Sequence, residues 1–419
     1  MTGETPLRAY GAVTAAYWAF MLSDGALRML VLLHFNALGF SPVQLAWLFL
    51  LYELAGIVTN LGAGWLAARF GLAATLRAGL ALQVGALVAL AGLDPGWTVG
   101  ASVVFVMAVQ GVSGVAKDLA KMSSKSAVRL LAPEGEGTLF RWVTLLTGSK
   151  NAVKGLGFFL GAALLAVFGF RPAVLAMAGV LAAILVAVML FLPGGLPGRM
   201  KPEEAWGGWR SRDPRVNRLS LARMFLFAAR DVWFVVGVPV YFQAVLSDGT
   251  PEGRREAFFV IGGFLALWII AYGAVQAAAP RILGGPAQPL DAITRKAGLW
   301  AGLLVPIPFA LALAALAAGG PAAWLTGVLI GGLVVFGLVF AVNSAVHSYL
   351  ILAFGDAARI TRDVGFYYMA NAAGRLIGTL LSGVSFQAGG LPLCLATAGA
   401  MAALSWWAVR RIDAAAGPV

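Results

Sequence analysis

The sequence predicts an all-α polytopic membrane protein with about twelve transmembrane helices. Of its 419 residues, 60% are hydrophobic and only 11% are charged, and the mean hydropathy is +0.87. Apolar runs of about 20 residues, long enough to cross a bilayer as a helix, follow one another to the C-terminus. The formal net charge is +12, but most basic residues lie in short connections between these runs. A nucleic-acid-binding surface is therefore not expected.

Each predicted span is an apolar run bounded by turn signals or charge. In chain order the spans are centred on residues 13–35, 43–67, 74–93, 99–120, 139–167, 171–192, 219–245, 257–280, 297–317, 322–350, 362–387 and 390–409. No small-residue cleavage site follows the first run, so we expect an uncleaved span.

The distribution of basic residues predicts the orientation of these spans. With the N-terminus in the cytoplasm, the outer connections hold only Arg171, Arg254 and Arg255, whereas the inner ones hold most of the other connecting Lys and Arg residues. This bias is what the positive-inside rule requires. It predicts a multi-pass protein with both termini in the cytoplasm. As its location we expect the bacterial cytoplasmic (inner) membrane.

A hydrophilic segment and a weak internal repeat predict the domain organisation. The segment is rich in Pro, Gly and charge, so we expect an N-terminal six-helix bundle at 1–192, a cytoplasmic linker at 193–218 and a C-terminal six-helix bundle at 219–419. An offset of about 207 matches Phe20, Asp24 and Phe35 with Phe227, Asp231 and Phe242. An offset of about 216 matches Asn60 with Gln276, and one of about 221 matches Arg141, Lys154 and Gly157 with Arg362, Arg375 and Gly378. Two pseudo-symmetric bundles of six spans are typical of the major facilitator architecture. The run Gly64–Gly71 has that architecture's Gly, Arg69 and second Gly, but Ala68 stands where an acid is expected.

Cationic residues inside the spans predict an anionic substrate. A charge at membrane depth costs about 2.5–3.5 kcal/mol on insertion scales, so spans keep one only where it faces protein or a water-filled cavity. We therefore expect Arg28, Lys150, Lys154, Arg230 and Arg375 to bind an anion between the helices.

The charged neighbours of these cations leave several interpretations open. Asp24 and Arg28, spaced i, i+4, can neutralise each other, and this pair is as compatible with a structural role as with a functional one. Lys150 and Lys154 repel unless an anion or an acid lies between them. Arg230 and Asp231 point about 100° apart on a helix, so we expect them to face different neighbours.

Polar residues complete the candidate site. Tyr367, Tyr368 and Asn371 share a helical wall with Arg375, Asn151 adjoins Lys150, and Lys117 could join the entrance. Glu53 is expected to be an unpaired carboxylate and, with Asp24 and Asp231, a candidate for proton coupling or charge pairing. Further candidates for a gate or polar cavity are Asn60, Gln276, Asn343 and His347.

The composition excludes several kinds of site. A single cysteine, Cys394, rules out an intrachain disulfide and a thiolate cluster, and two histidines, His34 and His347, are too few for a metal site. We expect neither a metal nor a cofactor, and no constellation of a nucleophile with an acid or base indicates an enzyme. A membrane-embedded enzyme is therefore the weaker alternative to a transporter.

Five segments resemble the organoarsenical efflux permeases of the major facilitator superfamily. They are Ser23–Leu30 (SDGALRML), Tyr52–Asn60 (YELAGIVTN), Ala116–Ser126 (AKDLAKMSSKS), Leu146–Gly155 (LTGSKNAVKG) and Ala229–Val236 (ARDVWFVV). The resemblance implies a secondary transporter that exports 1-arseno-3-phosphoglycerate, the ester formed when glyceraldehyde-3-phosphate dehydrogenase uses arsenate in place of phosphate. It thus implies functional coupling to that enzyme, and we expect a monomer. A carrier of organophosphates or other organic anions would use the same cations and remains the alternative.

Overall fold

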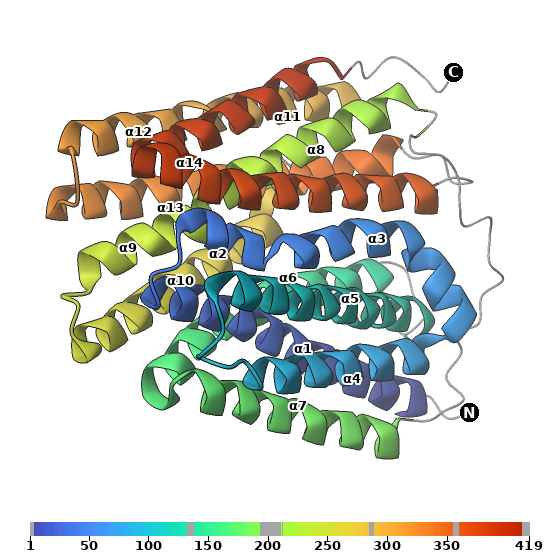
Figure 1. Ribbon diagram of the computed structural model, residues 1–419. Helices are drawn as coiled ribbons and strands as arrows, with labels where there is room; N and C mark the ends of the chain where they lie inside the picture. Colours follow the sequence, from blue (N-terminus) through green and yellow to red (C-terminus); the bar gives the residue numbers. More distant parts are fainter. Residues whose placement is uncertain are drawn as a thin grey trace.

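The computed structural model describes residues 4–131, 138–192, 211, 213–284, 289–354 and 360–412, without the side chains of 4–10, 61–70, 72, 122, 125–131, 138–148 and 360–362. All regular structure within these ranges is helical (Figure 1). The helices are α1 (Glu4–Ala37), α2 (Pro42–Leu48), α3 (Leu50–Phe70), α4 (Leu72–Ala91), α5 (Val99–Leu131), α6 (Thr138–Phe168), α7 (Phe170–Phe191), α8 (Pro214–Val232), η1 (Trp233–Gly237), α9 (Val238–Leu246), α10 (Pro251–Ile282), α11 (Leu290–Leu304), α12 (Pro306–Ala318), α13 (Ala323–Phe354) and α14 (Ile360–Arg410).

The helical segments confirm the predicted membrane class. In the described part of the chain, 11 segments are long and apolar enough to cross a membrane. The last of them, Asp363–Arg410, is bent at Gly389 and Gly390, where Gly390 has φ 61° and only glycine fits readily. It therefore holds both of the last two predicted spans, and the expected number of about twelve agrees with the fold.

Three predicted spans are interrupted rather than straight. The second breaks between α2 and α3 at Phe49, and the ninth breaks between α11 and α12 at Pro306, which has no backbone N–H to donate. The seventh contains η1, a π-helical turn between α8 and α9. The Oγ of Ser382 accepts hydrogen bonds from the backbone N–H groups of Val236 and Gly237, both at 3.1 Å. π-helical turns are frequent at functional sites, and this one directly follows Arg230 and Asp231.

The helices fall into two groups joined by contacts along their lengths. We call α1–α7 the first helix group and α8–α14 the second. Both described chain ends lie at the same end of the molecule, which we call the terminal end (Figure 1). Contacts between α3 and α14 and between α6 and α10 join the groups. At the end opposite the termini, Asn36 Nδ2 donates to Gln243 Oε1 at 2.6 Å. The expected linker lies mostly outside the described residues, so the domain boundaries stay a prediction.

The run Gly64–Gly71 is described only in part. The side chains of Ala68 and Arg69 lie outside the described set, while the backbone places Gly71 between α3 and α4 with φ 76°. This left-handed conformation favours glycine, which accounts for the last residue of the run.

Glycines allow equivalent helix crossings in the two groups. A Cβ at Gly157 of α6 would lie 2.5 Å from the backbone oxygen of Leu22 in α1. A Cβ at Gly378 of α14 would lie 2.8 Å from the backbone oxygen of Ala228 in α8. These are the two glycines that the internal repeat matches. The close crossings bring the charged residues on α1 and α6, and those on α8 and α14, within reach of one another.

We expect Gly157→Ala to lower the midpoint of thermal unfolding by several degrees, because the added Cβ meets a backbone atom that cannot move aside and overpacking costs about 1–3 kcal/mol. Gly179→Ala on α7 is the matched control, since a Cβ there meets nothing within 4 Å. The measurement is thermal unfolding of both purified variants in one detergent. Equal midpoints would contradict the close crossing.

Candidate functional site

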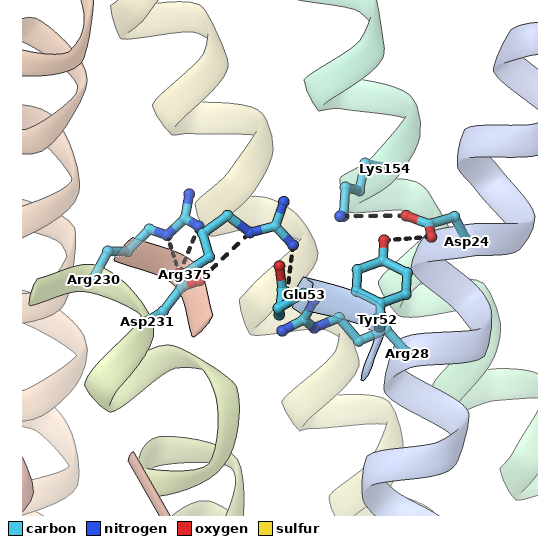
Figure 2. Close-up of polar contacts among 8 residues, drawn as sticks. All are labelled: Asp24, Arg28, Tyr52, Glu53, Lys154, Arg230, Asp231 and Arg375. Carbon is cyan, nitrogen blue, oxygen red and sulfur yellow. Dashed lines mark hydrogen bonds and ion pairs between the residues drawn. The ribbon is translucent and has the colours of Figure 1, made fainter. Parts of the chain in front are cut away.

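Seven charged residues gather between the two helix groups, five in one chain of ion pairs and two, Asp24 and Lys154, in a separate pair beside it. The charge network consists of Asp24, Arg28, Glu53, Lys154, Arg230, Asp231 and Arg375. Figure 2 shows these side chains converging from α1, α3, α6, α8 and α14. Every carboxylate in it contacts a cation from another helix, so the network ties together helices that are distant in sequence.

In the first helix group, Asp24 is held by two other helices. Its Oδ1 accepts a hydrogen bond of 2.6 Å from the hydroxyl of Tyr52 on α3, and its Oδ2 lies 3.4 Å from Nζ of Lys154 on α6. The predicted pairing of Asp24 with Arg28 is therefore not the one found. Spacing of i, i+4 makes such a pair possible, but the close crossing of α1 and α6 brings Lys154 to Asp24 instead.

Glu53 joins the two helix groups. Its Oε1 accepts hydrogen bonds from Nη1 of Arg28 at 2.8 Å and from Nη2 of Arg375 at 2.7 Å. The expectation that Glu53 is unpaired was thus wrong. The sequence places no cation near it on its own helix, and both partners come from helices that pack against α3.

In the second helix group, Asp231 contacts both arginines. Its Oδ1 accepts from Nε of Arg230 at 2.6 Å, and its Oδ2 lies 3.7 Å from Nε of Arg375. The expectation that Arg230 and Asp231 face different neighbours was wrong for Arg230, because its long side chain folds back onto the adjacent carboxylate. Asp231 does reach another helix, through Arg375 on α14.

The acids of the charge network are more deeply buried than its cations. The carboxylate side chains of Asp24, Glu53 and Asp231 are only 1–2% exposed, whereas the four cationic side chains are 11–18% exposed. The acids are enclosed by protein, and the cations keep the accessible surface. An anion that approaches the network would therefore meet cations first.

Lys117 adds a cation beside the network. This residue of α5 is 7% exposed, and its Nζ lies 4.0 Å from the ring centroid of Tyr52. Such cation–π contacts stabilise a buried ammonium without neutralising it. That Lys117 joins the entrance of an anion path stays a prediction. Lys150 lies one turn of α6 from Lys154 and is partly buried.

A second polar chain lies beside the charge network, toward the terminal end of α8. In this amide chain Asn151 Nδ2 donates to Gln276 Oε1 at 3.3 Å, and Gln276 Nε2 donates to Ser344 Oγ at 3.3 Å. Arg223 Nη1 donates to the same Ser344 Oγ at 3.0 Å, and its Nε donates to Asn371 Oδ1 at 3.1 Å. The chain thus runs from α6 through α10, α13 and α8 to α14.

Arg223 is the residue that sequence reasoning missed. It is 5% exposed, and its guanidinium carbon lies 4.2 Å from the ring centroid of Phe227 and 5.1 Å from that of Tyr367. Arg223 lies near the start of the predicted seventh span, in the region where basic residues are common. The available signal was its spacing of seven residues from Arg230, which puts both on one helix face.

The remaining predicted residues fall into two places. Asn60 Oδ1 accepts from Nζ of Lys121 at 3.0 Å, and the same Nζ lies 5.4 Å from the ring centroid of Tyr368, a contact between α5 and α14. Asn343 and His347 are fully buried on α13 near Ser344. The predicted wall of Tyr367, Tyr368, Asn371 and Arg375 is therefore divided, because Tyr368 lies toward Lys121 and Asn371 toward Arg223.

The described residues contain no group of three or more His, Cys, Asp and Glu side chains that could hold a metal ion. Cys394 is buried, and its Sγ donates to the backbone oxygen of Val232 at 3.1 Å. The chemistry that this region offers is the binding of charged groups by guanidinium, ammonium and amide donors.

A double-mutant cycle tests the Asp24–Lys154 pair. We expect Asp24→Asn and Lys154→Gln each to destabilise the protein, because each leaves a buried charge with one partner fewer, and the double variant to lose less than the sum. Residues in one ion-pair network typically couple by about 0.5–3 kcal/mol. The measurement is thermal unfolding in detergent, with Asp24→Asn combined with Arg410→Gln as the distant control pair. Additive effects for Asp24 and Lys154 would refute the contact.

Comparisons with known proteins place this fold in a family. The family model described as the Major Facilitator Superfamily matches residues 13–378. No curated protein sequence matches the chain significantly. A solved POT family transporter in complex with a thioalcohol-conjugated peptide is 16% identical, with a TM-score of 0.73 and coverage of 96% of this chain and 95% of that one.

Two further solved structures have the same fold. The nucleoside transporter NupG (D323A mutant) is 16% identical, with a TM-score of 0.71 over 96% of this chain and 99% of that one. A bacterial homologue of the iron transporter ferroportin, in an inward-facing state, is 13% identical, with a TM-score of 0.68 over 97% and 99%. At these identities the likeness concerns the fold alone. With the family model matched over most of its length, the chain belongs to the major facilitator superfamily, and it is a membrane transporter rather than an enzyme.

Proposed function

We propose that the protein exports an anionic organoarsenical, 1-arseno-3-phosphoglycerate, across the bacterial cytoplasmic membrane by alternating access. The observation that carries the proposal is the cation excess of the charge network: four cations share three carboxylates, and the cations keep the exposed surface. Lys117 and Arg223 increase the excess nearby. A cation at membrane depth is costly unless it pairs with an anion or faces a water-filled cavity, and a transported anion supplies such a partner.

The donor chemistry favours an oxyanion ester. Arginine presents a planar fork that binds phosphate-like groups bidentately, and pentavalent arsenate has the same tetrahedral oxygen geometry as phosphate. Trivalent arsenic prefers thiolates, and Cys394 is buried in a contact with Val232 rather than in the charge network. The resemblance of five segments to organoarsenical efflux permeases, four of which carry residues of the network, selects the arsenate ester among oxyanions.

Glu53 provides a mechanism for coupling binding to closure. One oxygen of its carboxylate accepts hydrogen bonds from Arg28 of the first helix group and from Arg375 of the second. A substrate oxyanion that displaces Glu53 takes over this bridging position and adds contacts to both groups. Closure of the bundles 1–192 and 219–419 around the substrate is then favoured, and it carries the site from one face of the membrane to the other. We place both termini and the linker 193–218 in the cytoplasm, from which the substrate enters.

A carrier of organophosphates is the second candidate, because guanidinium groups bind phosphate and arsenate with the same geometry. Transport of 3-phosphoglycerate itself, and not only its binding or competition, would favour this candidate.

Everted membrane vesicles test the substrate. We expect arsenic to accumulate with arsenate, glyceraldehyde 3-phosphate, glyceraldehyde-3-phosphate dehydrogenase and NAD together, and not with arsenate alone. Arg28→Gln and Arg375→Gln should each reduce accumulation at least about tenfold, since losing one charge-assisted contact costs about 1.4 kcal/mol or more. Arg410→Gln, at the exposed end of α14, is the matched control. Equal accumulation in both mixtures would refute the organoarsenical substrate.

Glu53→Gln tests the displacement step. Because the variant removes the acid that competes for Arg28 and Arg375, we expect it to bind 3-phosphoglycerate about tenfold more tightly, a difference of about 1.4 kcal/mol. The measurement is calorimetric titration of the purified protein, with Glu252→Gln at an exposed position as control. Weaker binding by Glu53→Gln would show that Glu53 does not compete with the substrate.

A further inference from the structure

We propose that Arg223, together with His347 and the amide chain, forms a second anion subsite, so that the transporter selects substrates with two anionic groups on a short carbon chain. This inference rests on the proposed function, because it adds a second binding point to an anion site centred on the charge network.

Arg223 is a buried cation compensated only by neutral groups. Its Nη1 donates to the backbone oxygen and the hydroxyl of Ser344, both at 3.0 Å, and its Nε donates to Asn371 at 3.1 Å. No carboxylate of the described residues lies within ion-pair distance of it, and none of these residues accepts a hydrogen bond from Nη2. Neutral dipoles orient a guanidinium but do not cancel its charge. Arg223 therefore differs from Arg28, Arg230 and Arg375, each of which contacts an acid.

Polar groups without partners lie on α13 near Ser344, the residue that Arg223 contacts. His347 is one turn of α13 from Ser344 and fully buried, and neither of its ring nitrogens has a hydrogen-bond partner among the described residues. Asn343, adjacent to Ser344, is also fully buried with both amide atoms unpartnered. Buried polar groups are nearly always hydrogen-bonded, so a set of unpartnered ones beside an uncompensated cation indicates a ligand position.

The subsite is separated from the charge network by a short distance along α8. Arg223 precedes Arg230 by seven residues, about 10 Å along a helix. Phe227 lies between them, with its ring centroid 4.2 Å from the Arg223 guanidinium carbon and 4.8 Å from that of Arg230. Both guanidinium groups thus flank one ring on the same helix face. Two anionic groups joined by a short carbon chain can reach both positions, whereas a single oxyanion can occupy only one.

The amide chain connects the subsite to the first helix group. Ser344 receives hydrogen bonds from Arg223 and from Gln276, and Gln276 accepts from Asn151 on α6. An anionic group bound at Arg223 therefore acts on a chain that crosses between the helix groups, as Glu53 does in the charge network. Because the subsite lies nearer the terminal end of α8, it is the first of the two that a substrate entering from that end would meet.

The test compares two ligands on the same protein sample. Glycerol 3-phosphate has one anionic group and 3-phosphoglycerate has two on a similar three-carbon frame. We expect the purified full-length wild type to bind 3-phosphoglycerate at least tenfold more tightly. In Arg223→Gln this ratio should fall to near one, while the affinity for glycerol 3-phosphate stays within about twofold of the wild-type value. Arg218→Gln, on the same helix but outside both sites, should keep the ratio.

Two further variants make the result independent of the stability of Arg223→Gln. His347→Phe keeps an aromatic ring at this position but removes the donor, so we expect the ratio to fall at least threefold. Arg223→Lys keeps the charge without the fork and should give an intermediate ratio. Equal losses of affinity for both ligands in these variants, or an unchanged ratio, would overturn the subsite. A wild type that binds glycerol 3-phosphate without preferring 3-phosphoglycerate would also overturn the subsite but leave the proposed function intact, whereas binding of neither ligand would overturn both.

Discussion

The arrangement of the transporter depends on one carboxylate oxygen, Glu53 Oε1, that is shared by Arg28 and Arg375. This contact is an ion pair between the two helix groups at the level of the charge network, and the carboxylate is almost completely buried. Breaking a buried pair leaves an uncompensated charge, at a cost of about 3–5 kcal/mol. Any motion that separates α3 from α14 breaks the Glu53–Arg375 pair and leaves Arg375 with only its 3.7 Å contact to Asp231, so Arg375 then needs a further anionic partner. On the proposed function, the substrate is that partner.

The internal repeat explains why the network has this form. Asp24 and Asp231 are equivalent, as are Lys154 and Arg375, and the structure pairs Asp24 with Lys154 and Asp231 with Arg375. Each helix group thus contains the same acid–base pair at the same glycine-lined crossing. The two copies differ in the cation. Arginine has several donors in a fork, so Arg375 contacts Asp231 through Nε and Glu53 through Nη2. A lysine at this position would have only one ammonium group for both contacts.

The sequence predicted the fold well because membrane spans follow from local composition. An apolar run of about 20 residues crosses the bilayer as a helix, because only a helix satisfies its backbone hydrogen bonds within the segment. The repeat predicted that Lys154 and Arg375 occupy equivalent positions. The ion-pair partners were mostly mispredicted, as for Glu53 and for Arg28. They are decided by which helices pack together, which no local pattern records. Arg223 was missed for a related reason, since its burial depends on α13 and α14, which contribute Ser344 and Asn371.

The charge network and the amide chain differ in how far their positive charge is neutralised when no substrate is bound. In the charge network, three acids neutralise most of the positive charge, so the helix groups can approach each other without a substrate. At Arg223 the neighbours are amides and hydroxyls, which hold the guanidinium in place but leave its charge unsatisfied. On the proposed function, a bound anion has to displace Glu53 in the first site and displaces no acid in the second. Discrimination among anions then falls to the second site, because occupation there costs no existing ion pair, and only a substrate long enough to reach it gains that contact.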